Sequence, residues 1–171
     1  MPKLSQQEFE EFMTAPGFYA RIATVDEDGY PRVIPIVFLF DEGKIKFTLR
    51  PNSAPQKNVR RDGRVAIAID ETAEPMRRVN VQGRVEIVFE PGEEDKWVHL
   101  HRRMLSKTHE ADYIEKYINA QFEAGIERPW LQIDLDAPTT RLRTWRNALP
   151  EEGDERLGLP YAKQYIVNAP D

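Results

Sequence analysis

Cysteine is absent from the 171-residue chain. Its absence excludes disulfides, thiol nucleophiles and thiolate metal sites, and it favours a reducing compartment such as the cytoplasm. Long apolar runs are also missing, because the longest, Val33–Phe40, falls far short of the roughly 20 residues that cross a bilayer. The stretch Met1–Met13 is acidic and amphipathic, which argues against a signal peptide. These absences predict a soluble, cytoplasmic protein without a membrane partner.

Basic residues are outnumbered by acidic ones, and histidine is scarce. The formal net charge is −5 and the pI is near 5.4, whereas a general nucleic-acid binder is usually basic, so we expect no nucleic-acid partner. The three histidines are His99, His101 and His109, and the first two would point about 200° apart on a helix. No H-E-x-x-H, G-x-S-x-G, G-x-G-x-x-G or Walker lysine motif occurs. The sequence therefore predicts no metal site and gives no support to a hydrolase or a nucleotide kinase.

β-Forming segments alternate with turn residues along most of the chain, which predicts about seven strands. The expected strands are Phe18–Val25, Arg32–Phe40, Ile45–Arg50, Arg64–Asp70, Met76–Glu90, Pro129–Asp136 and Thr139–Arg146. Their mostly short connections favour antiparallel pairing, and a sheet of this size commonly closes to hide its edges. We therefore expect a mainly β (α+β) fold, a six- to seven-stranded antiparallel barrel with peripheral helices. Apolar character throughout Arg32–Phe40 predicts burial on both faces, and Pro35 within it predicts an edge or a bulge.

Three helical regions are expected beside the strands. Ser5 followed by Glu8 predicts a capped N-terminal helix, and a second short helix is expected over about Ser53–Arg61. Residues 1–149 then form one barrel domain with a helical insertion at about 92–125, and residues 150–171 form an extension that packs on the barrel or on a partner. The insertion and the extension either cap a pocket and set substrate choice, or cover a barrel edge and clasp a second subunit.

A basic cluster surrounds the second expected helix. Arg50, Lys57, Arg60, Arg61 and Arg64 lie close together in the sequence, opposed before the next strand only by Asp62. The start of a helix offers unpaired amide N–H groups and the positive end of its dipole, which suit a phosphate. A solvated basic helix face explains the same residues equally well.

The expected strand around Val79–Ile87 alternates apolar and polar residues. Asn80 and Gln82 therefore project from one face, where their amides can donate and accept hydrogen bonds. The alternative is an ordinary wetted strand face. Trp145 and Arg146 end the last expected strand, and core packing is one role for Trp145.

The residue order resembles that of the split-barrel flavoproteins related to pyridoxamine 5′-phosphate oxidase. The resemblance runs from about Phe18 to Arg146, and its most specific parts are the "DG-P-V-P" strand entry, the "G-I-FT" strand and "S-x-x-x-K-N-V-x-R-D-x-R-V-A". It implies a homodimer that binds FMN, or in some branches a deazaflavin coenzyme, at the subunit interface. Each of two equivalent sites would be lined by both chains.

The resemblance also assigns roles to residues. The backbone of Ile34–Val37 would face the flavin ring, and Thr48, Gln56 and Lys57 would hold the phosphate. Since Gln56 stands where relatives often have a cation, Arg50 is our candidate for the missing charge. Asn80 and, more strongly, Gln82, Trp145 and Arg146 would reach the cofactor of the dimer mate. The candidate cofactor-binding residues are Ile34, Pro35, Ile36, Val37, Thr48, Leu49, Arg50, Ser53, Gln56, Lys57, Asn80, Gln82, Trp145 and Arg146.

The function implied is an FMN-dependent oxidoreductase that transfers hydride to or from a small molecule. Its partners would be a second copy, a small-molecule substrate and an electron donor, and no side-chain nucleophile is required because the flavin carries the chemistry. Three alternatives stay open: a deazaflavin-dependent reductase, a non-catalytic flavin- or haem-binding module, and vitamin B6 oxidation. The last is disfavoured because the region after Arg141 matches the B6 oxidases only loosely.

Overall fold

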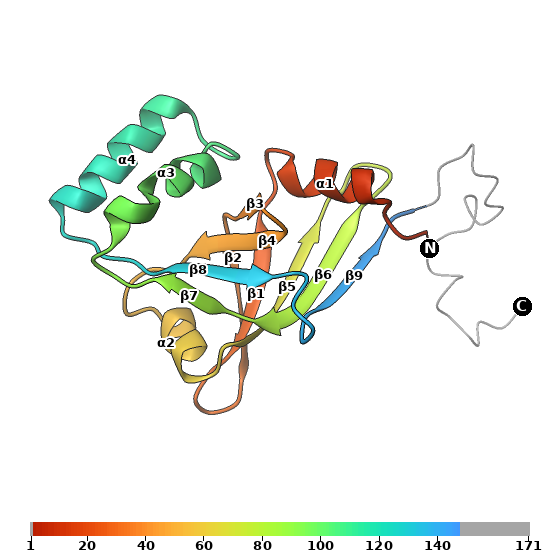
Figure 1. Cartoon of the computed structure of the whole chain (residues 1–171), viewed down its shortest axis with the longest axis horizontal. Helices are drawn as coiled ribbons and strands as arrows, with labels where there is room; N and C mark the ends of the chain where they lie inside the picture. The colour runs from red at the N-terminus through yellow and green to blue at the C-terminus, as the bar shows by residue number, and fades with distance from the viewer. Residues whose placement is uncertain (1, 148–171) are drawn as a thin grey trace, which may run out of the picture.

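The structure, a computed structural model, describes residues 2–147. Within these residues nine strands form two sheets in which every pairing is antiparallel (Figure 1). One sheet has the order β2 (Pro31–Ile36), β1 (Ala20–Val25), β5 (Arg64–Asp70), β6 (Arg78–Arg84) and β9 (Arg141–Trp145). The other has the order β3 (Leu39–Asp41), β4 (Lys44–Thr48), β8 (Trp130–Asp134) and β7 (Glu86–Phe89). The predicted mainly β, α+β architecture is confirmed.

The strand number differs from the predicted six to seven because two expected strands each divide between the sheets. Arg32–Phe40 becomes β2 and β3, and Met76–Glu90 becomes β6 and β7. The second division follows Gly83, where an added Cβ would lie 3.1 Å from the Thr140 hydroxyl and 3.2 Å from a methyl of Ile133. A glycine therefore lets the two sheets approach closely where the chain passes from one to the other.

The core lies mainly between the two sheets. Its fully buried side chains include Phe12, Ile22, Phe47 and Leu131, each with no exposed surface. The predicted burial of Arg32–Phe40 on both faces is wrong for the chain taken singly, since the side chain of Val33 is 60% exposed. The predicted edge position of Pro35 is confirmed, because β2 is the outermost strand of its sheet.

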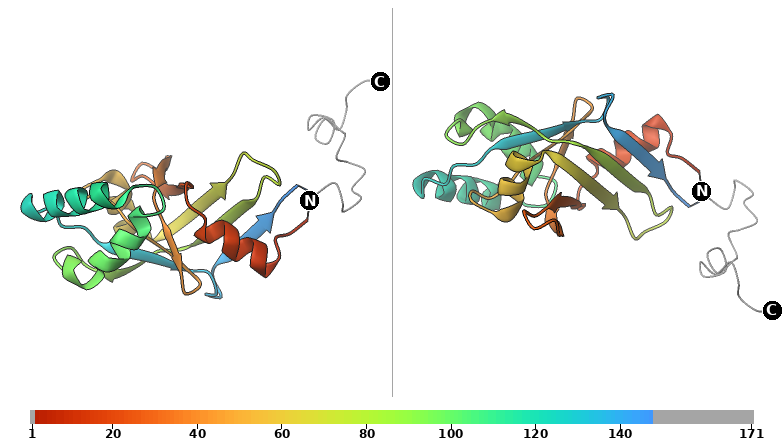
Figure 2. Two further views of the ribbon diagram at one scale, coloured as in Figure 1. Left: turned by 90° about the horizontal axis from the view of Figure 1, so that it is seen from above. Right: turned by 90° about the horizontal axis from the view of Figure 1, so that it is seen from below.

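Four helices surround the sheets. In α1 (Gln6–Thr14) the predicted capping box is present, and α2 (Ala54–Arg61) begins after Ser53, as expected. The predicted helical insertion consists of α3 (Glu94–Leu105) and α4 (Ala111–Glu123). These two helices lie together at the end of the molecule opposite the N-terminus, whereas α1 lies across the strands nearer to it (Figures 1 and 2).

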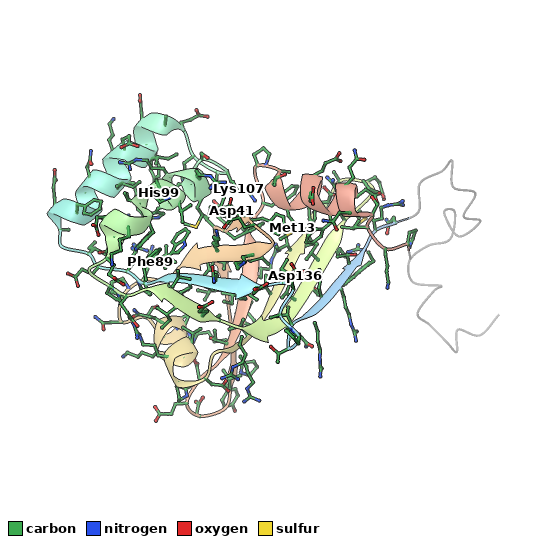
Figure 3. The ribbon with its side chains drawn as sticks, in the orientation of Figure 1. Met13, Asp41, Phe89, His99, Lys107 and Asp136 are labelled. Atoms are coloured by element: carbon green, nitrogen blue, oxygen red, sulfur yellow. The ribbon has the colours of Figure 1, made fainter. Side chains whose placement is uncertain are left out.

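The pair α3 and α4 is fixed to the barrel by side chains from both ends of α3. The Trp97 ring stacks on that of Trp130 with centroids 4.8 Å apart. Arg103 donates to Asp41 of β3 at 2.8 Å, and just beyond α3 the Lys107 Nζ donates to the carbonyl oxygen of Met13 at 2.7 Å (Figure 3). These contacts place the helix pair as a wall over one end of the four-stranded sheet.

Two further expectations concern the C-terminal extension and membrane-spanning segments. The predicted C-terminal extension, residues 150–171, lies outside the described residues. Among residues 2–147, no helix has both the length and the apolar character that a membrane crossing requires.

Candidate functional site

A cavity of about 400 Å³ opens where β2, β4, the start of α2 and the helix pair meet; we call it the main cavity. This volume lies within the usual range of small-molecule sites, about 300–1,000 Å³. It is lined by Ile34, Pro35, Ile36, Val37, Thr48, Leu49, Arg50, Ser53, Pro55, His101, Met104, Leu105, Tyr117 and Arg128.

Eight of the residues selected from the sequence line this one cavity. They are Ile34, Pro35, Ile36, Val37, Thr48, Leu49, Arg50 and Ser53. They gather there because the C-terminal end of β2 lies beside the turn that connects β4 to α2. Their convergence puts the predicted ring-binding and phosphate-binding segments on one surface.

The strand β2 offers backbone groups to a ligand as well as apolar side chains. It pairs with β1 on one side only, so part of its N–H and C=O groups point away from the sheet. Ile34 and Val37 are half-buried beside it, and Met104 and Leu105 of α3 face them across the cavity. An apolar surface with an unpaired strand edge suits a flat ring whose rim is polar.

The start of α2 has fewer free amides than the sequence suggested. The Ser53 Oγ accepts from the Gln56 N–H at 3.4 Å, and Pro55 has no N–H. Of the first three helical residues, only Ala54 keeps an amide without a partner among the described residues. The helix dipole remains, but side-chain cations must supply most of the attraction for an anion.

Gln56 and Thr48 have structural partners at this turn. Gln56 is buried, does not line the main cavity, and its Oε1 accepts from the Asn52 N–H at 2.6 Å. Asn52 has a φ of 58°, so this bond stabilises a left-handed turn residue. The Thr48 Oγ1 donates to the Pro129 carbonyl at 2.8 Å, which leaves it free only to accept. Gln56 thus shapes the turn that carries Arg50 and Ser53.

The basic cluster divides into paired and unpaired cations. Arg60 pairs with Glu90, Arg64 pairs with Asp62, and Arg61 donates to the carbonyl of Val25. These three are accounted for by surface contacts. In the described part of the chain, the side chains of Arg50 and Lys57 have neither a hydrogen bond nor an ion pair, and both are exposed. The solvated-surface interpretation therefore holds for three of the five cations and leaves Arg50 and Lys57 as the anion-binding candidates.

Arg128 is a cavity residue that the sequence analysis missed. Its Nη2 donates to the Tyr117 hydroxyl at 3.2 Å, while its Nε is buried without a partner among the described residues. Burial lowers the pKa of Arg128, and the neighbouring Arg50 lowers it further. Two guanidinium groups therefore share this cavity, which favours an anionic ligand. Arg128 lies just before β8, and only the fold brings it to Arg50.

His101 is the second residue missed, because its sequence position was considered only for metal binding. It is 5% exposed and packs against the rings of Trp97 and Tyr117. Burial lowers the pKa of His101 to about 4, with further lowering from Arg128 and Arg102. The imidazole is therefore neutral at pH 7 and adds a polar, uncharged group to the cavity wall.

Four predicted residues lie away from the main cavity of their own chain. Asn80 and Gln82 are exposed on the outer face of the five-stranded sheet. Trp145 is half-buried at the end of β9, and Arg146 is buried with its Nε donating to Glu8 at 2.6 Å. Arg146 therefore fixes the start of α1, and these residues can reach a cofactor only if a second chain brings one to them.

No group of three or more histidine or carboxylate side chains within residues 2–147 is placed to hold a metal ion. The polar side chains that line the main cavity are those of Thr48, Arg50, Ser53, His101, Tyr117 and Arg128.

The sequence profile of one family, pyridoxamine 5′-phosphate oxidase, matches residues 5–136. The chain belongs to this family. The match contains both sheets except β9, all four helices and every residue that lines the main cavity. The resemblance found in the sequence is thereby confirmed, whereas no curated protein sequence matches the chain.

Solved structures give the same fold at low sequence identity. The conserved hypothetical protein Rv2991 from Mycobacterium tuberculosis is 23% identical with a TM-score of 0.64, covering 92% of this chain and 90% of that one. An F420 reductase is 22% identical with a TM-score of 0.54, covering 73% and 90%. An FAD-binding protein from Mesorhizobium loti is 19% identical with a TM-score of 0.55, covering 84% and 97%. At these identities the likeness establishes the fold.

Proposed function

We propose that this protein is an oxidoreductase that binds FMN in the main cavity and transfers hydride to or from a small molecule. One observation carries the proposal: an apolar cavity beside an open strand edge has Arg50 and Arg128 in its wall, with no carboxylate lining it. A flat ring with a phosphate-bearing chain matches that distribution of apolar and positive surface. The neighbours described as an F420 reductase and an FAD-binding protein support a cofactor of this class.

The residues present fit such a cofactor. The backbone of Ile34–Val37 would bind the polar rim of the ring, and Leu49 and Met104 would pack on its faces. Arg50, Ser53 and Lys57 would hold the phosphate, with Ser53 also ordering the turn through its bond to the Arg50 carbonyl at 2.7 Å. When bound, the flavin supplies hydride transfer, so the protein needs no nucleophile of its own. Neutral His101 and Arg128 would orient the substrate or the cofactor from the α3 side of the cavity.

We further propose that two copies complete the site. The outer face of the five-stranded sheet has small and apolar side chains on the neighbouring strands β2, β1 and β5, namely Ala23, Val33, Ala66 and Ala68. Sheets pack face to face, and small side chains let them approach closely. Asn80 and Gln82 lie beside this patch, opposite Ala68 and Ala66, with no side-chain partner among the described residues. In a dimer their amides become available to the partner's cofactor.

A deazaflavin is the second candidate cofactor, because the F420 reductase shares the fold and a deazaflavin shares the tricyclic ring and the phosphate. A haem or a stored flavin without turnover is the non-catalytic alternative. These alternatives differ in absorption and emission spectra, and the last differs also in showing no substrate turnover.

The test is to titrate FMN, a deazaflavin and haemin separately into wild type, Arg50→Ala and Lys57→Ala. We expect FMN to bind wild type, and each substitution to weaken it by about 1.5–3 kcal/mol, the usual contribution of a charge-assisted hydrogen bond. Bound FMN should then be reduced by a nicotinamide donor and reoxidised by an acceptor.

Arg64→Ala is the matched control, because Arg64 belongs to the same basic cluster but its guanidinium pairs with Asp62 at 2.6 Å. Its affinity for FMN should equal that of wild type. Equal losses in all three variants would point to non-specific attraction, and failure of wild type to bind FMN would overturn the assignment.

A further inference from the structure

The main cavity has polar groups on two sides, and the phosphate of the proposed cofactor uses only one of them. Arg50 and Ser53 lie on the side of the turn before α2. The opposite side is formed by α3, α4 and the segment before β8, which contribute His101, Tyr117 and Arg128. We call these three residues the helix-side wall. Their chemistry indicates what kind of molecule binds beside the cofactor.

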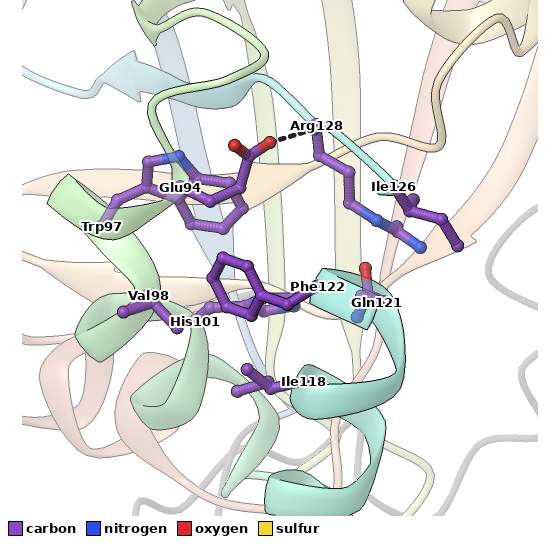
Figure 4. Close-up of a pocket in the computed structure, with 9 residues that line it drawn as sticks. All are labelled: Glu94, Trp97, Val98, His101, Ile118, Gln121, Phe122, Ile126 and Arg128. Carbon is purple, nitrogen blue, oxygen red and sulfur yellow. Dashed lines mark hydrogen bonds between the residues drawn. The ribbon is translucent and has the colours of Figure 1, made fainter. Parts of the chain in front are cut away.

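Arg128 gives the helix-side wall a half-buried positive charge without a neighbouring anion. The carboxylate of Glu94 accepts from two backbone N–H groups, that of Arg128 at 2.5 Å and that of Gly92 at 3.0 Å. Figure 4 shows the guanidinium of Arg128 extending away from this carboxylate. No carboxylate within residues 2–147 pairs with the guanidinium, although a desolvated charge is normally compensated. An anion supplied by a ligand would therefore be stabilised here.

Tyr117 adds a second donor next to this cation. The Nη2 of Arg128 donates to the Tyr117 hydroxyl oxygen at 3.2 Å, and both side chains line the main cavity. Because the oxygen accepts from Arg128, the hydroxyl hydrogen is available to another acceptor, and the described part of the chain provides none. A guanidinium and a hydroxyl group side by side suit the two oxygens of one carboxylate.

His101 leaves the helix-side wall with the charge of a single cation. Burial lowers the pKa of His101 to about 4, so its ring is neutral at pH 7. Leu105, four residues later on the same face of α3, adds apolar surface to the cavity. The wall therefore matches a ligand with one negative charge and an apolar body. A phosphate ester, with a charge of about −1.5 to −2 at pH 7, would exceed the single positive charge.

We propose that the substrate is a small apolar monocarboxylic acid whose carboxylate binds to Arg128 and Tyr117. Its apolar body lies against Leu105. This inference rests on the proposed function, because it places the acid in the cavity that would hold the flavin. It makes Arg128 a substrate-binding residue, distinct from Arg50 at the phosphate.

The test uses benzoate as the probe and is run on protein without FMN and with FMN. Calorimetry measures benzoate binding, and the flavin absorption spectrum reports both FMN loading and its perturbation by benzoate. We expect saturable benzoate binding that persists after FMN is loaded, because the acid and the phosphate use different arginines. Benzyl alcohol, which has the same ring without the charge, should bind at least about tenfold more weakly.

Variants show whether the two proposed donors are responsible. Arg128→Met should weaken benzoate binding at least about tenfold and leave FMN affinity unchanged, whereas Arg50→Ala should mainly weaken FMN binding. Tyr117→Phe should weaken benzoate binding several-fold. Arg128→Lys keeps the charge without the forked donors, so it should also bind benzoate several-fold more weakly than wild type.

Two matched controls come from the same helices. Arg102 on α3 is engaged with Glu115 at 2.7 Å and does not line the main cavity. Tyr113 lies one turn before Tyr117 on α4, where it is 50% exposed and also outside the cavity. Arg102→Met and Tyr113→Phe should therefore bind benzoate like wild type.

The inference is overturned if benzoate does not bind, if FMN displaces it, or if benzyl alcohol binds as tightly. It is also overturned if a folded Arg128 variant binds benzoate like wild type, or if Arg128→Met loses as much FMN affinity as Arg50→Ala. Binding of FMN without benzoate would contradict this inference alone. Binding of benzoate through Arg128 without FMN would overturn the cofactor assignment and leave the carboxylate site in place.

Discussion

The ring of His101 is enclosed by aromatic side chains and also lines the main cavity. Within residues 2–147 no hydrogen bond fixes its nitrogens, and two arginines lie close enough to disfavour its protonation. Arg128 lies beside His101 and is a half-buried cation close to a second cation, Arg50. Single side chains thus make the wall of the main cavity positively charged and rich in hydrogen-bond donors. None of the residues that line it is acidic.

Acid should destabilise the fold through His101. Burial lowers its pKa from the ordinary 6.5 to about 4, so as the pH falls the unfolded chain takes up a proton before the folded chain does. Stability is therefore lost as the pH falls from 6.5 to 4, by on the order of 3 kcal/mol for this group. His101→Gln should remove that part of the pH dependence, measured by urea unfolding at several pH values.

His99→Gln is the control, since His99 lies on the same helix but is exposed. Its pH profile should follow wild type. If the free energy of unfolding depends on pH equally in wild type and His101→Gln between pH 6.5 and 4, then burial does not lower the pKa of His101 in the folded state.

At the scale of one element, α2 presents the main cavity with a capped helix end. Ser53 accepts from one amide and donates to the Arg50 carbonyl, so the same hydroxyl closes the helix and positions the turn. The turn then directs Arg50 into the cavity wall, while α2 carries Lys57 on its exposed side. The helix therefore contributes to the site mainly by positioning charged side chains, and less by offering free backbone N–H groups.

Two serine caps allow this role to be separated from stability. Ser53→Ala and Ser5→Ala each remove an N-cap, and each should cost about 1 kcal/mol of unfolding free energy. Only Ser53→Ala should also weaken FMN binding, because Ser5 caps α1, away from the main cavity. Calorimetric titration with FMN distinguishes them, and equal FMN affinities in the two variants would contradict a role for the α2 turn.

At the scale of the whole molecule, the two sheets are joined where the chain leaves β6 for β7. Gly83→Val should destabilise the fold by about 1–3 kcal/mol, the usual cost of overpacking, because its Cβ would meet Ile133 and Thr140 at under 3.3 Å. Ala120→Val, at an exposed position on α4, is a comparison in which added methyl groups point into solvent. Denaturant unfolding measures both, and an equal stability of the two variants would refute the close approach at Gly83.

The outer face of the five-stranded sheet leads to a prediction about assembly. Wild type should sediment as a dimer, and Val33→Arg should sediment as a monomer, because it places an added charge from each chain within the proposed contact. Tyr113→Arg changes another exposed hydrophobic residue, on α4, and should remain dimeric. A monomeric wild type, or a dimeric Val33→Arg, would contradict the proposed assembly.

The sequence predicted those parts of the fold that depend on local patterns. Alternation located the strands, and Ser5 and Ser53 located the helix starts within one residue. The divisions at Val37–Phe38 and after Gly83 were missed, because a strand that changes sheets keeps its apolar pattern while its partners change. The burial of Val33 was mispredicted because apolar composition alone does not distinguish a strand buried on both faces from an exposed edge strand.

The main cavity was predicted where its residues are contiguous, as in Ile34–Val37 and Thr48–Arg50. Arg128, just before β8, and His101, on α3, were missed because only tertiary structure brings them to the cavity. The free amides expected at α2 were overestimated because the hydroxyl that marks the helix start also occupies one of them. Local chemistry was therefore visible in the sequence, and long-range pairing was not.

The helix pair has one more consequence. β7 and β8 are neighbours in the sheet, with Phe89 opposite Trp130, so the whole stretch between them leaves and re-enters the barrel at adjacent points. That stretch can be exchanged as one continuous segment, by evolution or by design, while the strands that would hold the cofactor keep their order. New specificities can thus arise by replacing one continuous piece of the gene while the barrel stays unchanged.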